Sequence, residues 1–168
     1  GSFKEALFTK GALRFYQGEQ KSFDDLMKSE YKQHAYMRSF SWIFSLPKLP
    51  TLYFNKWDFF DAVIKLSIIS RPFYEFGVWR GTSFKYLIKA LKRGYGFDTF
   101  TGLPKDWDVG NKVEKAGSYS NDGNVPKIKG GEFIPGKFED TLPLFFSESR
   151  PKASVINFDA DFVFLDHL

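Results

Sequence analysis

Two acidic residues at the ends of short apolar segments carry the clearest chemical signal in this sequence. Glu75 directly precedes a glycine turn that begins at Gly77 and ends at Gly81, and Asp98 ends a second short apolar segment. Asp98 lies 21 positions after Gly77. A doubly wound α/β sheet places a carboxylate at about this spacing to bind the hydroxyls of a nucleoside. The spacing therefore predicts a nucleoside-binding site, although an Asp at this place can also cap a helix or a turn.

The charge of Glu75 bears on which nucleoside the site would take. Gly77 permits a tight turn, and the helix expected from Thr82 directs its free N–H groups towards a ligand. In a dinucleotide-binding protein such groups hold a pyrophosphate, whereas the carboxylate of Glu75 would repel phosphate and attract an amine or a sulfonium. The pattern Glu-x-Gly-x-x-x-Gly also lacks one glycine of the dinucleotide fingerprint. These residues favour S-adenosylmethionine over a dinucleotide, and a tight turn without a ligand is the alternative.

A second pair of acids, Asp159 and Asp161, follows the most hydrophobic predicted strand. Carboxylates just beyond a parallel strand lie in the crevice where ligands bind. Two acids separated by one residue can share Mg²⁺, which prefers oxygen ligands, and Asp159 can act as a base that deprotonates a hydroxyl. The other interpretation is that one acid only caps a following helix, and the residues alone leave both open.

The composition excludes several kinds of site. The 168 residues include no cysteine, which rules out disulfides and cysteine-based zinc sites and fits a cytoplasmic location. The net charge of +4 is spread along the sequence without a long basic run, so we expect no nucleic-acid partner. The apolar stretches are interrupted by charge and too short to cross a bilayer, so we expect no membrane partner.

From residue 71 onwards, strand and helix patterns alternate, which predicts an α/β fold with a parallel sheet. Short apolar runs mark the strands, and apolar residues at helical spacing mark the helices. The predicted strands cover residues 73–76, 95–97, 132–134 and 153–158, and the predicted helices cover 82–92 and 141–147.

The chain before residue 71 is predicted to be helical, with its last helix at about 55–70. We therefore place a domain boundary between residues 1–70 and 71–168, and we attribute Gly1-Ser2 to a cleaved tag. Residues 105–131 are polar and rich in Gly, Asn, Asp and Lys. Because loops this long are uncommon unless they are functional or disordered, we predict a loop on the substrate side.

Four blocks, in order, resemble the macrocin O-methyltransferase-like family of class I S-adenosylmethionine-dependent methyltransferases. The blocks are 74–83 (YEFGVWRGTS), 95–104 (YGFDTFTGLP), 136–143 (GKFEDTLP) and 157–161 (NFDAD). Each block alone is weak evidence of the resemblance, but the four blocks together and in this order are specific to the family. They span a little over half of the chain, and residues 3–70 show no such likeness.

The resemblance implies a Rossmann-like class I methyltransferase sheet that binds S-adenosylmethionine. The implied cofactor-binding residues are Glu75, Gly77, Val78, Gly81, Thr82, Ser83, Asp98, Thr99 and Phe100. Glu75 and the glycines would line the methionine side, and Asp98 would hold the ribose. By the same resemblance, Asp159 and Asp161 match an acidic pair that is tied to Mg²⁺ and to the acceptor hydroxyl, with Asp159 as the catalytic residue.

The implied reaction is O-methylation of a hydroxyl on a small molecule or sugar, assisted by Mg²⁺. In the family more sheet follows the acidic pair, so we expect a domain truncated after its fourth strand, which would make this chain an inactive fragment. An uncovered fourth strand would favour association into a homo-oligomer. The alternatives are a non-catalytic nucleoside-binding or scaffold domain and an NAD-dependent oxidoreductase, which Glu75 and the missing glycine disfavour.

Overall fold

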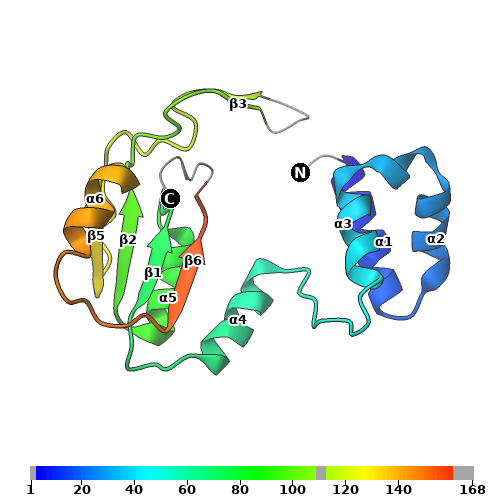
Figure 1. The fold of residues 1–168 in the computed structure, drawn as a ribbon, viewed down its shortest axis with the longest axis horizontal. Coiled ribbons are helices and arrows are strands. Elements are labelled where there is room, and N and C mark those ends of the chain that lie inside the picture. Colours follow the sequence, from blue (N-terminus) through cyan, green and yellow to red (C-terminus); the bar gives the residue numbers. More distant parts are fainter. Residues whose placement is uncertain (1–2, 109–112, 161–168) are drawn as a thin grey trace. The chain divides into compact units, whose positions relative to one another are not determined.

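A computed structural model of the chain describes residues 3–108 and 113–160, and it divides into two compact units (Figure 1). The first unit is Gly1–Phe59 and the second is Phe60–Leu168. This division falls earlier than the boundary expected after residue 70. The reason is that Phe60 and Ile64, on the helix α4 (Lys56–Leu66), pack into the core of the second unit.

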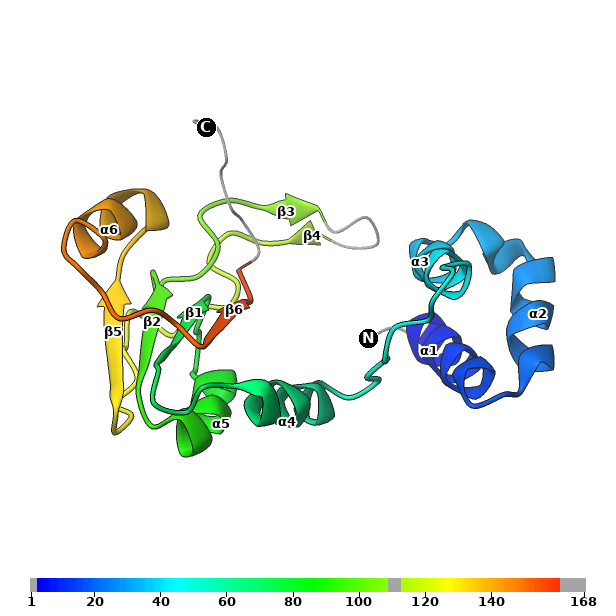
Figure 2. The same cartoon turned by 60° about the horizontal axis from the view of Figure 1, so that its bottom comes forward.

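The first unit is helical and has a small aromatic core. Its elements are α1 (Phe3–Tyr16), α2 (Gln20–Lys28), a 3₁₀ turn (Glu30–Gln33) and α3 (Ala35–Phe44). Phe8, Ala12, Phe23 and Met37 are buried where these helices meet. The rings of Phe15 and Phe44, with centroids 4.3 Å apart, extend this core. The helical pattern expected for this part of the chain is therefore confirmed (Figure 2).

The second unit contains a four-stranded parallel sheet, as the sequence predicts. Its strands are β1 (Phe73–Phe76), β2 (Gly94–Asp98), β5 (Gly131–Pro135) and β6 (Val155–Phe158), and their order across the sheet is β5-β2-β1-β6. Every neighbouring pair is parallel. In chain order this is 3-2-1-4, which is compatible with a Rossmann-like fold. The strand order reverses between β1 and β6, so the ligand crevice of such a sheet is expected at their carboxyl ends.

Helices cover both faces of this sheet (Figures 1 and 2). On one face, α5 (Thr82–Leu91) places Phe84, Leu87 and Leu91 against Phe73 of β1. On the other face, α6 (Phe138–Phe145) places Phe145 against the aromatic rings of β1 and β2. Strand β1 is buried at every position, which explains why its sequence shows no alternation of apolar and polar residues.

Tyr74 ties β1 to the segment that leads into β6. Its hydroxyl donates a hydrogen bond to the Pro151 carbonyl at 2.6 Å. Burial of the phenol raises the pKa of Tyr74 above its ordinary value of 10.0, and the nearby Tyr95 adds to the effect. The ring remains neutral at physiological pH and acts as a hydrogen-bond donor.

The outermost strands of the sheet differ in how they meet solvent. On β6, Ile156 and Phe158 are 54% and 68% exposed, and Phe158 stacks on Phe76 with a centroid distance of 4.7 Å. Strand β5 instead carries Glu132 and ends at Pro135, and charge and proline are devices that discourage pairing at a sheet edge. The expected uncovered apolar surface on the fourth strand is therefore present among the described residues.

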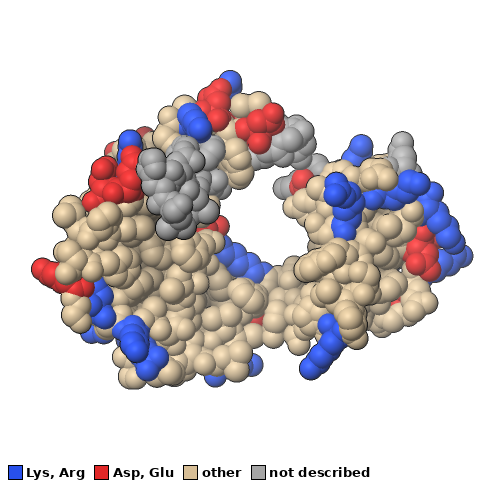
Figure 3. Space-filling view, viewed as in Figure 1, with Lys and Arg blue, Asp and Glu red and all other residues tan. Residues whose placement is uncertain are grey.

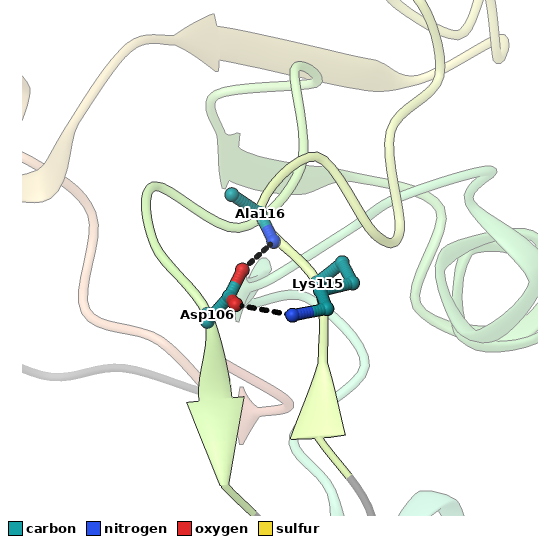
Figure 4. Close-up of polar contacts among 3 residues, drawn as sticks. All are labelled: Asp106, Lys115 and Ala116. Atoms are coloured by element: carbon teal, nitrogen blue, oxygen red, sulfur yellow. Dashed lines mark hydrogen bonds and ion pairs between the residues drawn. The ribbon is translucent and has the colours of Figure 1, made fainter.

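The polar region 105–131 is more structured than the sequence indicates. It contains a short antiparallel pair, β3 (Trp107–Asp108) and β4 (Val113–Glu114). At the base of this pair, the Asp106 carboxylate accepts hydrogen bonds from Lys115 Nζ at 2.7 Å and from the Ala116 N–H at 2.9 Å (Figure 4). The hydrogen bond from Lys115, followed by that from the Ala116 amide, holds the pKa of Asp106 below its ordinary value of 3.8.

The surface and the helix lengths bear on the expected partners. Among the described residues, no helix combines the length and the apolar character that crossing a bilayer requires. On the visible surface of each unit, Lys and Arg atoms lie among Asp and Glu atoms and uncharged residues (Figure 3). The absence of a nucleic-acid partner stays a prediction.

Candidate functional site

The loops that follow β1, β2 and β6 meet at the point where the strand order reverses. The Gly77 N–H donates to the Phe97 carbonyl at 2.9 Å, and the Asp159 N–H donates to the Phe76 carbonyl at 2.8 Å. Gly77 has a φ of +87°, and a Cβ built on it would collide with the backbone carbonyl of Asp159. Only glycine fits this turn, because the backbone after β6 lies directly against it.

Asp98, at the end of β2, ties two of these loops together. Its Oδ2 accepts hydrogen bonds from the N–H groups of Val78 and Trp79, each at 2.7 Å. Its Oδ1 accepts a third from the Phe100 N–H, also at 2.7 Å. Hydrogen bonds to a carboxylate are stronger than neutral ones, and three of them fix both loops relative to the strand end.

This arrangement changes the role expected for Asp98. A carboxylate has about four acceptor positions, and the backbone uses three of them, so about one remains for a ribose hydroxyl. The N–H groups of Val78 and Trp79, which would donate to phosphate in a dinucleotide-binding loop, are directed at Asp98 instead. The loop as formed is therefore poorly suited to a pyrophosphate.

Glu75 is the most deeply buried charged residue of the described chain, with 1% of its surface exposed. It lies in β1 between Gly96 of β2 and Asn157 of β6. Its Oε1 accepts a hydrogen bond from Asn157 Nδ2 at 3.3 Å. Burying a carboxylate costs several kcal/mol unless hydrogen bonds or a cation compensate. An ionised Glu75 would place a negative charge beneath the turn at Gly77, which a cationic group of a ligand would compensate.

The other predicted cofactor-binding residues lie in the loop after β1, in the turn after β2 and in the first turn of α5. Val78 and Phe100 are buried in the core below the loops, and their N–H groups already donate to Asp98. Thr82 and Ser83 form the first turn of α5 after Gly81, which is left-handed with a φ of +73°. The described structure places these residues in the loops at the carboxyl ends of β1 and β2 and at the start of α5.

Thr99 serves the turn that follows β2. Its hydroxyl contacts the Gly102 carbonyl at 3.5 Å and accepts a hydrogen bond from the Thr101 N–H at 3.3 Å. The side chain is half-buried, so it lies beside the site and closes the turn at the same time.

The predicted metal site can be followed at one of its two residues. Asp159 is exposed and directly follows β6, with its backbone against the turn at Gly77. Asp161 lies outside the described residues. Over residues 3–108 and 113–160, no three acidic or histidine side chains gather as a metal-holding group. The Mg²⁺ site therefore stays a prediction.

Residues 117–124 belong to the region predicted as a substrate-side loop and form a wall beside the loops after β1 and β2, but the sequence did not predict their contacts. Trp79 Nε1 donates to the Ser120 carbonyl at 3.1 Å, and the Trp79 and Tyr119 rings meet edge to face at 5.8 Å. The Phe100 carbonyl accepts hydrogen bonds from two backbone N–H groups of this segment. The signal available in the sequence was only the high content of Gly, Asn and Ser, which does not specify a partner.

Backbone strain marks the same place. Five described residues other than glycine have positive φ, and four of them lie in these loops: Trp79, Phe100, Tyr119 and Asp122. Such conformations cost on the order of 1–3 kcal/mol each and concentrate at ligand sites.

Comparison of the chain with family models, curated proteins and solved structures gives no match. The functional argument therefore rests on the geometry of these loops.

Proposed function

We propose that this chain is an S-adenosylmethionine-dependent methyltransferase, or part of one, that acts on a hydroxyl of a small molecule or sugar. The observation that carries the proposal is the distribution of charge at the crevice. Glu75 is buried beneath the glycine turn, and Asp98 already occupies the amides of Val78 and Trp79. A site with two carboxylates, in which the amides of Val78 and Trp79 are already bonded, fits a nucleoside that carries an amine and a sulfonium better than one that carries phosphates.

In the proposed reaction, the main role of the protein is to position the two reactants. S-adenosylmethionine supplies a methyl group on a positively charged sulfur, and transfer to the acceptor oxygen breaks the carbon–sulfur bond and leaves a neutral thioether. Glu75 provides negative charge on the cofactor side. In this proposal Asp159, which is exposed beside the turn at Gly77, accepts the proton from the acceptor hydroxyl. Holding oxygen and methyl in line provides most of the rate enhancement.

A non-catalytic nucleoside-binding domain is the second candidate. The exposed apolar strand β6 favours it, because such a surface is typical of a domain that associates with another. It predicts that the cofactor binds without methyl transfer. The NAD-dependent oxidoreductase is disfavoured further, since the loop amides that would hold the pyrophosphate are bonded to Asp98.

Calorimetric titration with adenosylhomocysteine, with and without Mg²⁺, tests the proposal. We expect binding to the wild-type chain, competition by S-adenosylmethionine and none by NAD. Glu75→Gln keeps the side-chain shape and removes the charge, so we expect it to weaken binding by about tenfold or more. Glu139→Gln, an exposed change on α6, is the matched control and should bind as the wild type does. Binding of NAD in preference to adenosylhomocysteine would refute the proposal.

A further inference from the structure

We propose that Asp98 is a built-in anion that fills an anion-binding position formed by the backbone, and that it thereby restricts the site to nucleosides without phosphate. The first part concerns the fold alone. The second part rests on the proposed function, because it assumes that a nucleoside binds at this crevice.

The geometry is that of a bound anion with its protein donors. Three backbone N–H groups converge on one carboxylate at 2.7 Å, and two of them come from the loop after β1, 19 and 20 positions earlier in the chain. Successive N–H groups directed at one point form a concave site that binds carboxylate or phosphate. A turn-capping Asp needs only the local contact to Phe100, so the two contacts from the other loop are additional.

The position fits a phosphate oxygen as well as a carboxylate. The N–H groups of Val78 and Trp79 follow the glycine turn at the carboxyl end of β1, which is where a dinucleotide-binding loop holds its phosphates. Removing the Asp98 carboxylate would leave these donors directed at a space without an acceptor, at a cost that any small anion could offset. An anion in solution should therefore bind to an Asp98 variant but not to the wild type.

Chemical rescue by formate tests this inference. Thermal unfolding of the sheet unit, followed at the NMR signals of the β2 amides of Tyr95 and Phe97, is compared for wild type, Asp98→Ala, Asp98→Asn and Asp106→Ala in sodium chloride and in sodium formate of equal ionic strength. Asp98→Ala should lower the midpoint by roughly 5–15 °C, and formate should recover at least about a third of that loss. Asp98→Asn fills the space with an amide, so formate should not recover its loss.

Asp106→Ala is the matched control on another carboxylate of the same domain. Asp106 accepts one backbone hydrogen bond on an exposed hairpin, so its removal leaves no enclosed set of donors, and formate should have no effect on this variant (Figure 4). Equal midpoints for Asp98→Ala in formate and chloride would overturn the inference. If Asp98→Ala does not fold in chloride, recovery of its circular dichroism in formate supports the inference.

If Asp98→Ala folds in neither salt, hydrogen exchange of Asp98→Asn decides. The inference requires faster exchange at the amides of Val78, Trp79 and Phe100 than in the wild type, and unchanged exchange contradicts it. Specificity is tested by titration with inorganic phosphate, which should bind Asp98→Ala at least about tenfold more tightly than the wild type. Failure of the wild type to bind adenosylhomocysteine would refute the proposed function and leave the formate result standing, so the two can fail separately.

Discussion

Replacing Gly77 by alanine should destabilise the sheet unit by about 2–5 kcal/mol. The φ of +87° costs a residue with a Cβ about 1–2 kcal/mol. The new methyl group would also meet the Asp159 carbonyl carbon at 2.7 Å, and relieving an overpacked contact of this kind costs about 1–3 kcal/mol more. The neighbour that must move is backbone at the end of β6, so no flexible side chain can absorb the strain.

Gly117→Ala separates the two contributions. Gly117 has a φ of +82°, but nothing lies within 4 Å of a Cβ built on it. This variant should therefore lose only the conformational part, about 1–2 kcal/mol. The chain has two compact units that need not unfold together, so a single denaturation midpoint is not a safe measure. Native-state hydrogen exchange at the β2 amides of Tyr95 and Phe97 reports the free energy of opening of the sheet unit itself.

One outcome would refute this reasoning about the turn at Gly77. If Gly77→Ala and Gly117→Ala lower the opening free energy by the same amount, the backbone after β6 does not lie against the turn. The account of the crevice as a junction of three loops would then be wrong.

Three further predictions concern the surroundings of the site. Trp79→Phe keeps an aromatic ring and loses the indole hydrogen bond to Ser120, so hydrogen exchange should show the 117–124 segment destabilised by about 1 kcal/mol, and no change would argue against this wall. Because the pKa of Asp106 is lowered, its bond to Lys115 is fully formed above pH 3.8 and is lost as pH falls further, which carboxyl NMR titration should show as an inflection below that value. Because the pKa of Tyr74 is raised, the protein should lose stability as pH rises above 10.0, and Tyr74→Phe should show a smaller loss.

The strands and the long helix of the sheet unit were predictable because their signals are local. Phe73–Phe76 was expected at the observed bounds, since a fully buried strand between Pro72 and Gly77 reads as a continuous apolar run. The helix after Gly81 was expected to within one residue for a similar reason. The helix near 141–147 starts earlier, at Phe138, because Pro143 lies inside it rather than in its first turn.

The contacts of the site were less predictable because they join distant residues. The spacing places Asp98 at the end of the second strand, but nothing in the sequence says that its carboxylate accepts from Val78 and Trp79. The hairpin at Trp107–Glu114 is also unforeseen, since its two strands have only two residues each and lack an alternating pattern. Pairing between chain segments, rather than local preference, decides both features.

The strand order also sets the sequence of events by which the crevice can be completed. Pairing Phe73 with Gly94 closes a loop of 21 residues, whereas pairing Phe73 with Val155 closes one of 82 residues. The longer closure costs about 1.2 kcal/mol more in chain entropy, and during synthesis the last strand emerges well after the first three. Since Asp159 follows that strand, the third of the three loops at the site, the one after β6, is in place only when β6 docks on β1. Any slowing of this step, by mutation or by competing association, would delay ligand binding more than it delays formation of β1, β2 and β5.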